Sequence, residues 1–278
     1  MPAAFLPDRA LIRISGPEAE HFLQNLVTTD VAALPAGEAG PGALLTPQGK
    51  ILFDFLIARD GDGFLLETAT GQQADLVRRL TMYKLRAAVT LAAEPEAGVT
   101  VSWGGERDAT ALLDKRFAAA GTVLGRRPGR HAGEDDGSYL DLRIAAGIAE
   151  SGTDFALQDA FPHDVLMDRN GGIGFKKGCY VGQEVVSRMQ HRGTARRRVV
   201  LVGGETALPA TGTEITIGGK PVGTLGSVRG AAGLAIVRID RVGEALATGV
   251  PVLAGETAVA VSLPAWSGLD FPTAAEEA

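Results

Sequence analysis

Hydrophobic positions in the first part of the chain follow a strand period and then a helix period. Residues 9–15 have the pattern of a strand. The apolar residues from Ala19 to Val27 recur at i, i+3, i+4 and i+7, the spacing of one helix face. Ser15 and Glu18 have the spacing of a capping box, which would satisfy N–H groups at the helix start. The pattern predicts a strand followed by an amphipathic helix.

The pattern of elements continues to the end of the first hundred residues. Two or three strands are predicted within residues 42–69, interrupted at the turn 60–63. A second helix is expected near residues 72–85, and a strand near residues 87–92. The order β-α-β-β-α-β is that of a ferredoxin-like unit. A related pattern begins again with a strand and a helix ending at Gly121, although periodicity alone does not complete a second unit.

The spacing of apolar residues and glycines changes at Arg198. From there on, short apolar runs alternate with glycine turns, which is typical of a small β-sandwich or β-barrel. The predicted architecture is an α/β body up to about residue 195 and a β module after it.

Composition and charge narrow the class of protein. Hydrophobic residues make up 45% of the 278 residues and charged residues 22%, the balance of a globular protein. No apolar run has the length of a membrane helix, and the first residues do not resemble a secretory signal. The net charge of −6 argues against a dedicated nucleic-acid binder. One cysteine excludes an intrachain disulfide and fits a reducing compartment, so we expect a cytoplasmic protein.

A basic segment stands out against this acidic average. Residues 176–198 contain seven bases and one acid, Glu184. Such a segment indicates an anionic ligand or partner, with a solvated helix face as the alternative of equal weight.

The one cysteine lies inside that segment. Cys179 follows two lysines and precedes a predicted helix, and both features favour the thiolate and lower the pKa of a cysteine. The alternative is a small buried cysteine that packs as a hydrophobe. A lone cysteine cannot hold an iron–sulfur cluster by itself, and the four histidines lack zinc-site spacing, so no metal site is predicted.

An aspartate in a predicted strand is the second candidate. In ILFDFLIA, residues 51–58, alternation places Asp54 on one face with Leu56 and Ala58. A carboxylate on an apolar face must be paired, protonated or directed into a cavity. It could therefore bind a polar heterocycle, or it could form a salt bridge at the end of the sheet.

The motif KGCYVGQE, residues 177–184, matches the pattern K-G-C-[FY]-x-G-Q-E. On this motif the chain resembles the YgfZ family of folate-binding proteins, which are related to the aminomethyltransferase (T-protein) of the glycine cleavage system. The resemblance extends over nearly the whole chain. The motif residues are Lys177, Gly178, Cys179, Tyr180, Gly182, Gln183 and Glu184.

The resemblance implies an α+β fold with a T-protein-like arrangement around a central folate channel. Its expected parts are a ferredoxin-like folate-binding domain (1–97), a second ferredoxin-like domain with the motif (98–195), a C-terminal β-barrel (196–268) and a tail (269–278). It further implies an accessory factor for the assembly or repair of iron–sulfur proteins that binds tetrahydrofolate. Transient iron–sulfur client or assembly proteins would be its partners. Cys179 would be the reactive thiol and Lys177 its activator.

The departures from T-protein bear on the reaction. T-protein has paired acids where this chain has only Asp54, and it lacks the cysteine of the motif. The missing second acid and the additional cysteine disfavour the alternative function, a folate-dependent aminomethyltransferase or related one-carbon transferase. Asp54 remains an expected folate contact. The family's folate-binding aromatics align with Tyr139, which could stack on a pterin ring, and with Arg9, which is not aromatic.

Overall fold

The computed structural model describes residues 1–95 and 98–272. The chain divides into two compact units. The first unit comprises Met1–Ser138 and Asn170–Val185, and the second comprises Tyr139–Arg169 and Val186–Ala278.

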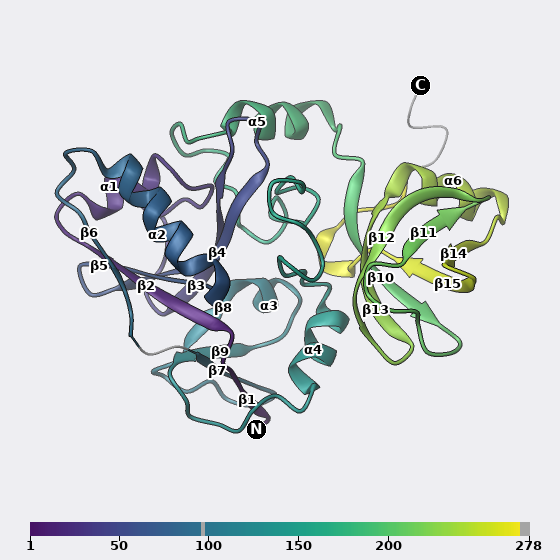
Figure 1. Cartoon of the computed structure of the whole chain (residues 1–278), viewed down its shortest axis with the longest axis horizontal. Coiled ribbons are helices and arrows are strands. Elements are labelled where there is room, and N and C mark those ends of the chain that lie inside the picture. The colour runs from purple at the N-terminus through teal and green to yellow at the C-terminus, as the bar shows by residue number, and fades with distance from the viewer. Residues whose placement is uncertain (96–97, 273–278) are drawn as a thin grey trace. The chain divides into compact units, whose positions relative to one another are not determined.

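The described residues of the first unit form a nine-stranded sheet (Figure 1). The strand order is β1-β7-β9-β8-β3-β4-β5-β2-β6. In chain order the strands are β1 (Ala3–Leu6), β2 (Arg9–Ser15), β3 (Glu38–Leu45), β4 (Ile51–Asp60), β5 (Gly63–Ala69), β6 (Thr90–Ala93), β7 (Val99–Trp103), β8 (Leu112–Asp114) and β9 (Leu124–Pro128).

One parallel strand pair joins the two predicted α/β halves. β3 and β8 pair through Glu38 with Leu113 and Ala39 with Asp114, whereas the neighbouring pairs in this sheet are antiparallel. The two halves therefore share one continuous sheet, which sequence periodicity does not reveal.

Two helices cover one face of this sheet. α1 (Ala19–Gln24) and α2 (Thr70–Lys84) contribute apolar residues to the same buried cluster as alternate residues of β4. That cluster includes Phe22, Leu23, Phe53, Phe55, Ile57, Leu76 and Leu80. The short helix α3 (Lys115–Ala119) follows β8 directly. The alternation in β4 is what gives the sheet an apolar face for α1 and α2.

The start of α1 differs from the predicted capping box. Ser15 is the last residue of β2, and Glu18 is the N-cap residue without a side-chain cap. The Glu18 carboxylate instead accepts a hydrogen bond from the backbone N–H of Ala88 at 2.6 Å. The capping-box prediction is wrong because the Glu18 carboxylate binds the N–H of Ala88, far along the chain, instead of the N–H of Ser15.

The described residues of the second unit contain a closed six-stranded barrel in the order β10-β13-β12-β11-β14-β15, drawn green to yellow in Figure 1. Its strands are β10 (Arg197–Gly204), β11 (Glu214–Ile217), β12 (Lys220–Arg229), β13 (Ala232–Arg238), β14 (Val252–Ala254) and β15 (Thr257–Ser262). β10 closes the barrel by pairing with both β13 and β15. The predicted β module is thus a barrel.

The remaining helices flank these strands in the sequence. They are α4 (Ser138–Ala146), α5 (Gln183–Arg192), α6 (Ile239–Thr248) and the 3-10 helix η1 (Ala265–Ser267). Of the helices in the described residues, none is both long enough and apolar enough to cross a membrane. The predicted domain bounds stay predictions. The bound at residue 97 and residues 273–278 of the predicted tail lie outside the described residues.

Candidate functional site

A buried lysine attaches the motif loop to the first unit. Lys177 is 8% exposed, and its Nζ donates hydrogen bonds to the carbonyls of Val27 at 2.6 Å and Thr29 at 2.8 Å. Burial lowers the pKa of Lys177 to about 8, and the nearby Asp30 carboxylate opposes that shift. The ammonium group of Lys177 therefore binds two backbone carbonyls, independently of any effect that it has on the thiol of Cys179.

Two further motif residues have structural reasons for their identity. Gly182 has a φ of +78°, and a Cβ at this position would lie 2.5 Å from the Thr46 carbonyl oxygen. Only glycine fits there without a shift of the backbone. Tyr180 is 7% exposed, its ring lies 5.1 Å from the Lys177 Nζ, and burial raises the pKa of its hydroxyl to about 12. Gly182 thus allows the backbone turn of the loop, and the buried ring of Tyr180 packs beneath it.

Cys179, in contrast, is exposed. Lys177 and Tyr180 are buried, whereas Gly178 and Cys179 between them are exposed. α5 begins four residues later at Gln183, with Glu184 in its first turn, which confirms the predicted helix. At Gly178 a Cβ would meet nothing within 4 Å. The thiol is accessible to a partner, and its activation by Lys177 stays a prediction.

The anchoring role of Lys177 can be separated from any role in thiol chemistry. We expect Lys177→Met to lower the free energy of unfolding by about 2 kcal/mol, because the Val27 and Thr29 carbonyls lose their donor. Urea denaturation measures the change. Lys176→Met, at the exposed neighbouring lysine, is the control and should stay within about 0.5 kcal/mol of the parent. Equal stability of the two variants would contradict the anchor.

Asp54 lies half-buried on β4, opposite Ala43 of β3. Its Oδ1 accepts a hydrogen bond from Gln72 Nε2 of α2 at 3.4 Å, and its backbone carbonyl accepts one from the Thr68 hydroxyl at 2.9 Å. A partly exposed carboxylate beside a carboxamide combines acceptors with donors, as the edge of a pterin ring requires. Asp54 and Gln72 thus supply the acceptor and donor types that such a contact would need, and the contact of Asp54 with folate stays a prediction.

Arg9 belongs to a buried ion network. It is 9% exposed, and its Nε donates to Glu67 Oε1 at 2.8 Å. Glu67 also accepts from Arg126, whose NH1 lies 3.2 Å from Asp114 Oδ2. Burial by itself would raise the pKa of Glu67, but Arg126 and Arg9 lower it to about 2. Arg9 thus has a structural partner, and its contact with folate stays a prediction.

Tyr139 lies in the second unit, on α4. It is 4% exposed, and its hydroxyl donates to Glu150 Oε1 at 3.3 Å. Of the predicted folate contacts, Asp54 and Arg9 belong to the first unit and Tyr139 to the second. Stacking of Tyr139 on a pterin, and the channel that would bring these residues together, stay predictions.

The buried ion network was not predicted from the sequence. Glu67, Arg126 and Asp114 come from β5, β9 and β8, and each is less than 9% exposed. The available signal was a charged residue at an inward strand position, as in LLETA. Among residues 1–95 and 98–272, no group of three or more His, Cys, Asp or Glu side chains is placed to hold a metal ion.

Two segments of the chain match known domain families. Residues 9–104 match the GCVT N-terminal domain, and residues 196–269 match the CAF17 C-terminal beta-barrel domain. The crystal structure of glycine cleavage system aminomethyltransferase T from Bartonella henselae superimposes with a TM-score of 0.69 at 17% identity. The match covers 94% of this chain and 86% of that one. The predicted T-protein-like fold is confirmed.

Three similar proteins are iron-sulfur cluster assembly factors, two of them named IBA57 and one an IBA57 homolog. The mouse protein is 31% identical over 98% of this chain and 86% of its own, and the human protein 29% identical over 94% and 84%. The homolog from Pyricularia oryzae is 34% identical over 70% of this chain, which spans 55% of that protein's length.

These relatives correct one expectation. All three are named mitochondrial proteins, so the prediction of a cytoplasmic location is wrong. The prediction rested on a single cysteine, and a reduced thiol fits any reducing compartment rather than the cytoplasm alone. The identity to the mouse protein, at this coverage of both chains, shows that the chain belongs to the IBA57 family of iron–sulfur cluster assembly factors.

Proposed function

We propose that this chain is a tetrahydrofolate-binding accessory factor for the assembly or repair of iron–sulfur proteins, of the kind its YgfZ resemblance implies. Cys179 would be its reactive thiol. The observation that carries the proposal is the exposed Cys179 on a loop anchored by buried Lys177, in a chain whose relatives are named iron–sulfur cluster assembly factors.

The thiol half of the proposal rests on access. A thiolate is the nucleophilic and metal-binding form of cysteine, and it must meet its target directly. Phe175, 40% exposed, and the exposed Lys176 lie on the same loop as Cys179. An apolar and a basic side chain beside the thiol suit a transient contact with a client or assembly protein. Transient interfaces are small, and a basic group beside the thiol would attract an acidic patch on the partner.

The folate half of the proposal rests on Asp54 and on the match to the GCVT N-terminal domain. Tetrahydrofolate, when bound, would supply a carrier for one-carbon units. Asp54 would accept hydrogen bonds from N–H groups of the pterin ring. Gln72, hydrogen-bonded to Asp54 Oδ1, would hold the carboxylate in that orientation.

Calorimetric titration of the anaerobic, purified chain with tetrahydrofolate tests this half. We expect saturable binding that Asp54→Ala weakens by ~10-fold or more, because about 1.4 kcal/mol is lost with the charged acceptor. Asp62→Ala, at an exposed aspartate in the β4–β5 turn, is the matched control and should bind like the parent. Absence of binding, or equal affinity of the two variants, would refute a pterin site at Asp54.

A further inference from the structure

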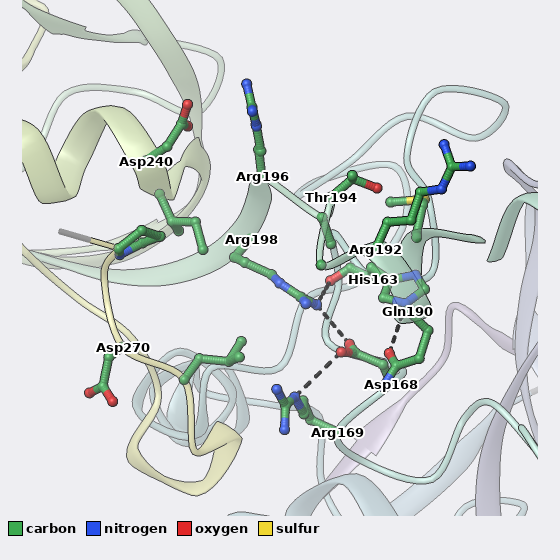
Figure 2. Close-up of a pocket in the computed structure, with 16 residues that line it drawn as sticks. His163, Asp168, Arg169, Gln190, Arg192, Thr194, Arg196, Arg198, Asp240 and Asp270 are labelled. Atoms are coloured by element: carbon green, nitrogen blue, oxygen red, sulfur yellow. Dashed lines mark hydrogen bonds and ion pairs between the residues drawn. The ribbon is translucent and has the colours of Figure 1, made fainter. Parts of the chain in front are cut away.

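A cavity of about 460 Å³ opens within the second unit (Figure 2). Its walls come from the end of α5, the start of β10, the start of α6 and residues 269–272, together with residues 163–169. Cavities of this volume hold small molecules in many proteins. The lining is polar and contains four arginines: Arg169, Arg192, Arg196 and Arg198.

One side of the pocket is an ion cluster built around the buried Asp168 carboxylate. Arg198 NH1 donates to Asp168 Oδ1 at 2.7 Å and to the His163 carbonyl at 2.6 Å, and Arg169 Nε lies 3.4 Å from Asp168 Oδ2. Two arginines thus share one carboxylate. His163 is fully buried and hydrogen-bonded to Gln190, and burial lowers its pKa, so its ring is neutral at pH 7. This side carries a surplus of positive charge.

The other side carries two cations without a carboxylate of their own. Arg192 and Arg196 are exposed, and in Figure 2 their guanidinium groups lie on either side of Thr194. Within residues 1–95 and 98–272, neither side chain makes a hydrogen bond or an ion pair.

The acids that line the pocket do not cancel this charge. The carboxylate of Asp240 accepts two hydrogen bonds from Arg238. Nε donates to Oδ1 at 3.2 Å, and NH2 donates to Oδ2 at 2.5 Å. The field of Arg196 adds only a minor part to the lowered pKa of Asp240. Asp270 is the remaining lining acid. The pocket keeps an excess of positive charge at Arg192 and Arg196.

We propose that this pocket binds a small polyanion through its phosphate or carboxylate oxygens. Arg192 and Arg196 would each grip an oxyanion in a forked geometry, since a guanidinium matches two oxygens of either group. The Thr194 hydroxyl and the Gln190 amide line the same space and offer neutral donors. The inference does not depend on folate binding.

Titration of the full chain with pyrophosphate and, separately, with citrate tests the pocket. We expect saturable binding of at least one anion, weaker at higher ionic strength. The double variant Arg192→Gln/Arg196→Gln should bind ~10-fold or more weakly. The control Arg78→Gln/Arg241→Gln removes the same charge from two exposed arginines that pair within their own helices, and should bind within about 2-fold of the parent.

The outcomes separate the source of the oxyanion. Binding of pyrophosphate alone assigns a phosphate ligand, and binding of citrate alone a carboxylate ligand. Failure of both anions to saturate the parent chain, or an equal loss of affinity in the control pair, would overturn the inference. Asp54→Ala should leave this titration unchanged, so failure of the folate proposal and failure of the pocket are distinguishable.

Discussion

Replacing Cys179 by serine is expected to abolish the activity of the protein in cells while leaving it folded. In cells that lack the protein, the variant should restore iron–sulfur enzyme activity no better than an empty vector, a loss of ~10-fold or more against the parent chain. Serine keeps the size of cysteine, but its hydroxyl is neither an appreciable nucleophile nor a soft metal ligand at neutral pH without an adjacent base. The exposed position of Cys179 makes a packing defect a poor alternative explanation.

Two measurements make this outcome decisive. The Cys179→Ser protein should unfold at the parent's temperature and bind tetrahydrofolate with the parent's affinity. Met82→Ser removes a sulfur-containing side chain at another exposed position, 63% accessible, and should rescue fully. Full rescue by Cys179→Ser would eliminate the reactive thiol from the proposed function and leave the motif as a structural element.

Replacing Glu67 by glutamine is expected to cause the largest loss of stability. Glu67 accepts hydrogen bonds from Arg9 at 2.8 Å and from Arg126, which is 1% exposed. Removing one partner of a buried ion network leaves a buried charge uncompensated, which costs about 3–5 kcal/mol. We expect a loss of that order in the free energy of unfolding, measured by denaturant titration at neutral pH.

The same network predicts how the parent chain responds to acid. The pKa of Glu67 is about 2 in the folded chain against 4.5 for the ordinary glutamate. Because the folded value is the lower one, the stabilisation is fully present above pH 4.5 and is lost as the pH falls toward 2. It amounts to about 3 kcal/mol. Glu67→Gln should flatten the pH dependence in this window.

A control separates this network from surface charge. Glu20 pairs with Arg59 at 2.8 Å on a side chain that is 49% exposed. Glu20→Gln should cost less than about 1 kcal/mol, because water screens an exposed pair. A Glu67→Gln variant as stable as Glu20→Gln, or with the parent's acid profile, would contradict the role assigned to the network.

Most elements that depend on neighbours in the sequence were predicted correctly, although the capping box at Ser15 and Glu18 was not. The turn at 60–63 pairs Asp60 with Gly63, α5 begins within the motif and ends before Gly193, and the β-rich segment after Arg198 is a barrel. Each depends on local periodicity and on glycine turns, which a window of about ten residues contains. The motif likewise placed Cys179 just before a helix start, whereas its exposure came from the structure.

The order of elements, the two kinds of architecture and the position of the candidate thiol all follow from the sequence. The partners of the charged residues, in contrast, depend on how the chain folds. Glu67 lies 58 residues from Arg9, and Lys177 lies 150 residues from Val27, so no local pattern contains either contact. The parallel β3–β8 pair is likewise non-local. A buried charge must find a partner wherever the fold brings one, because the cost of leaving it alone exceeds any local preference.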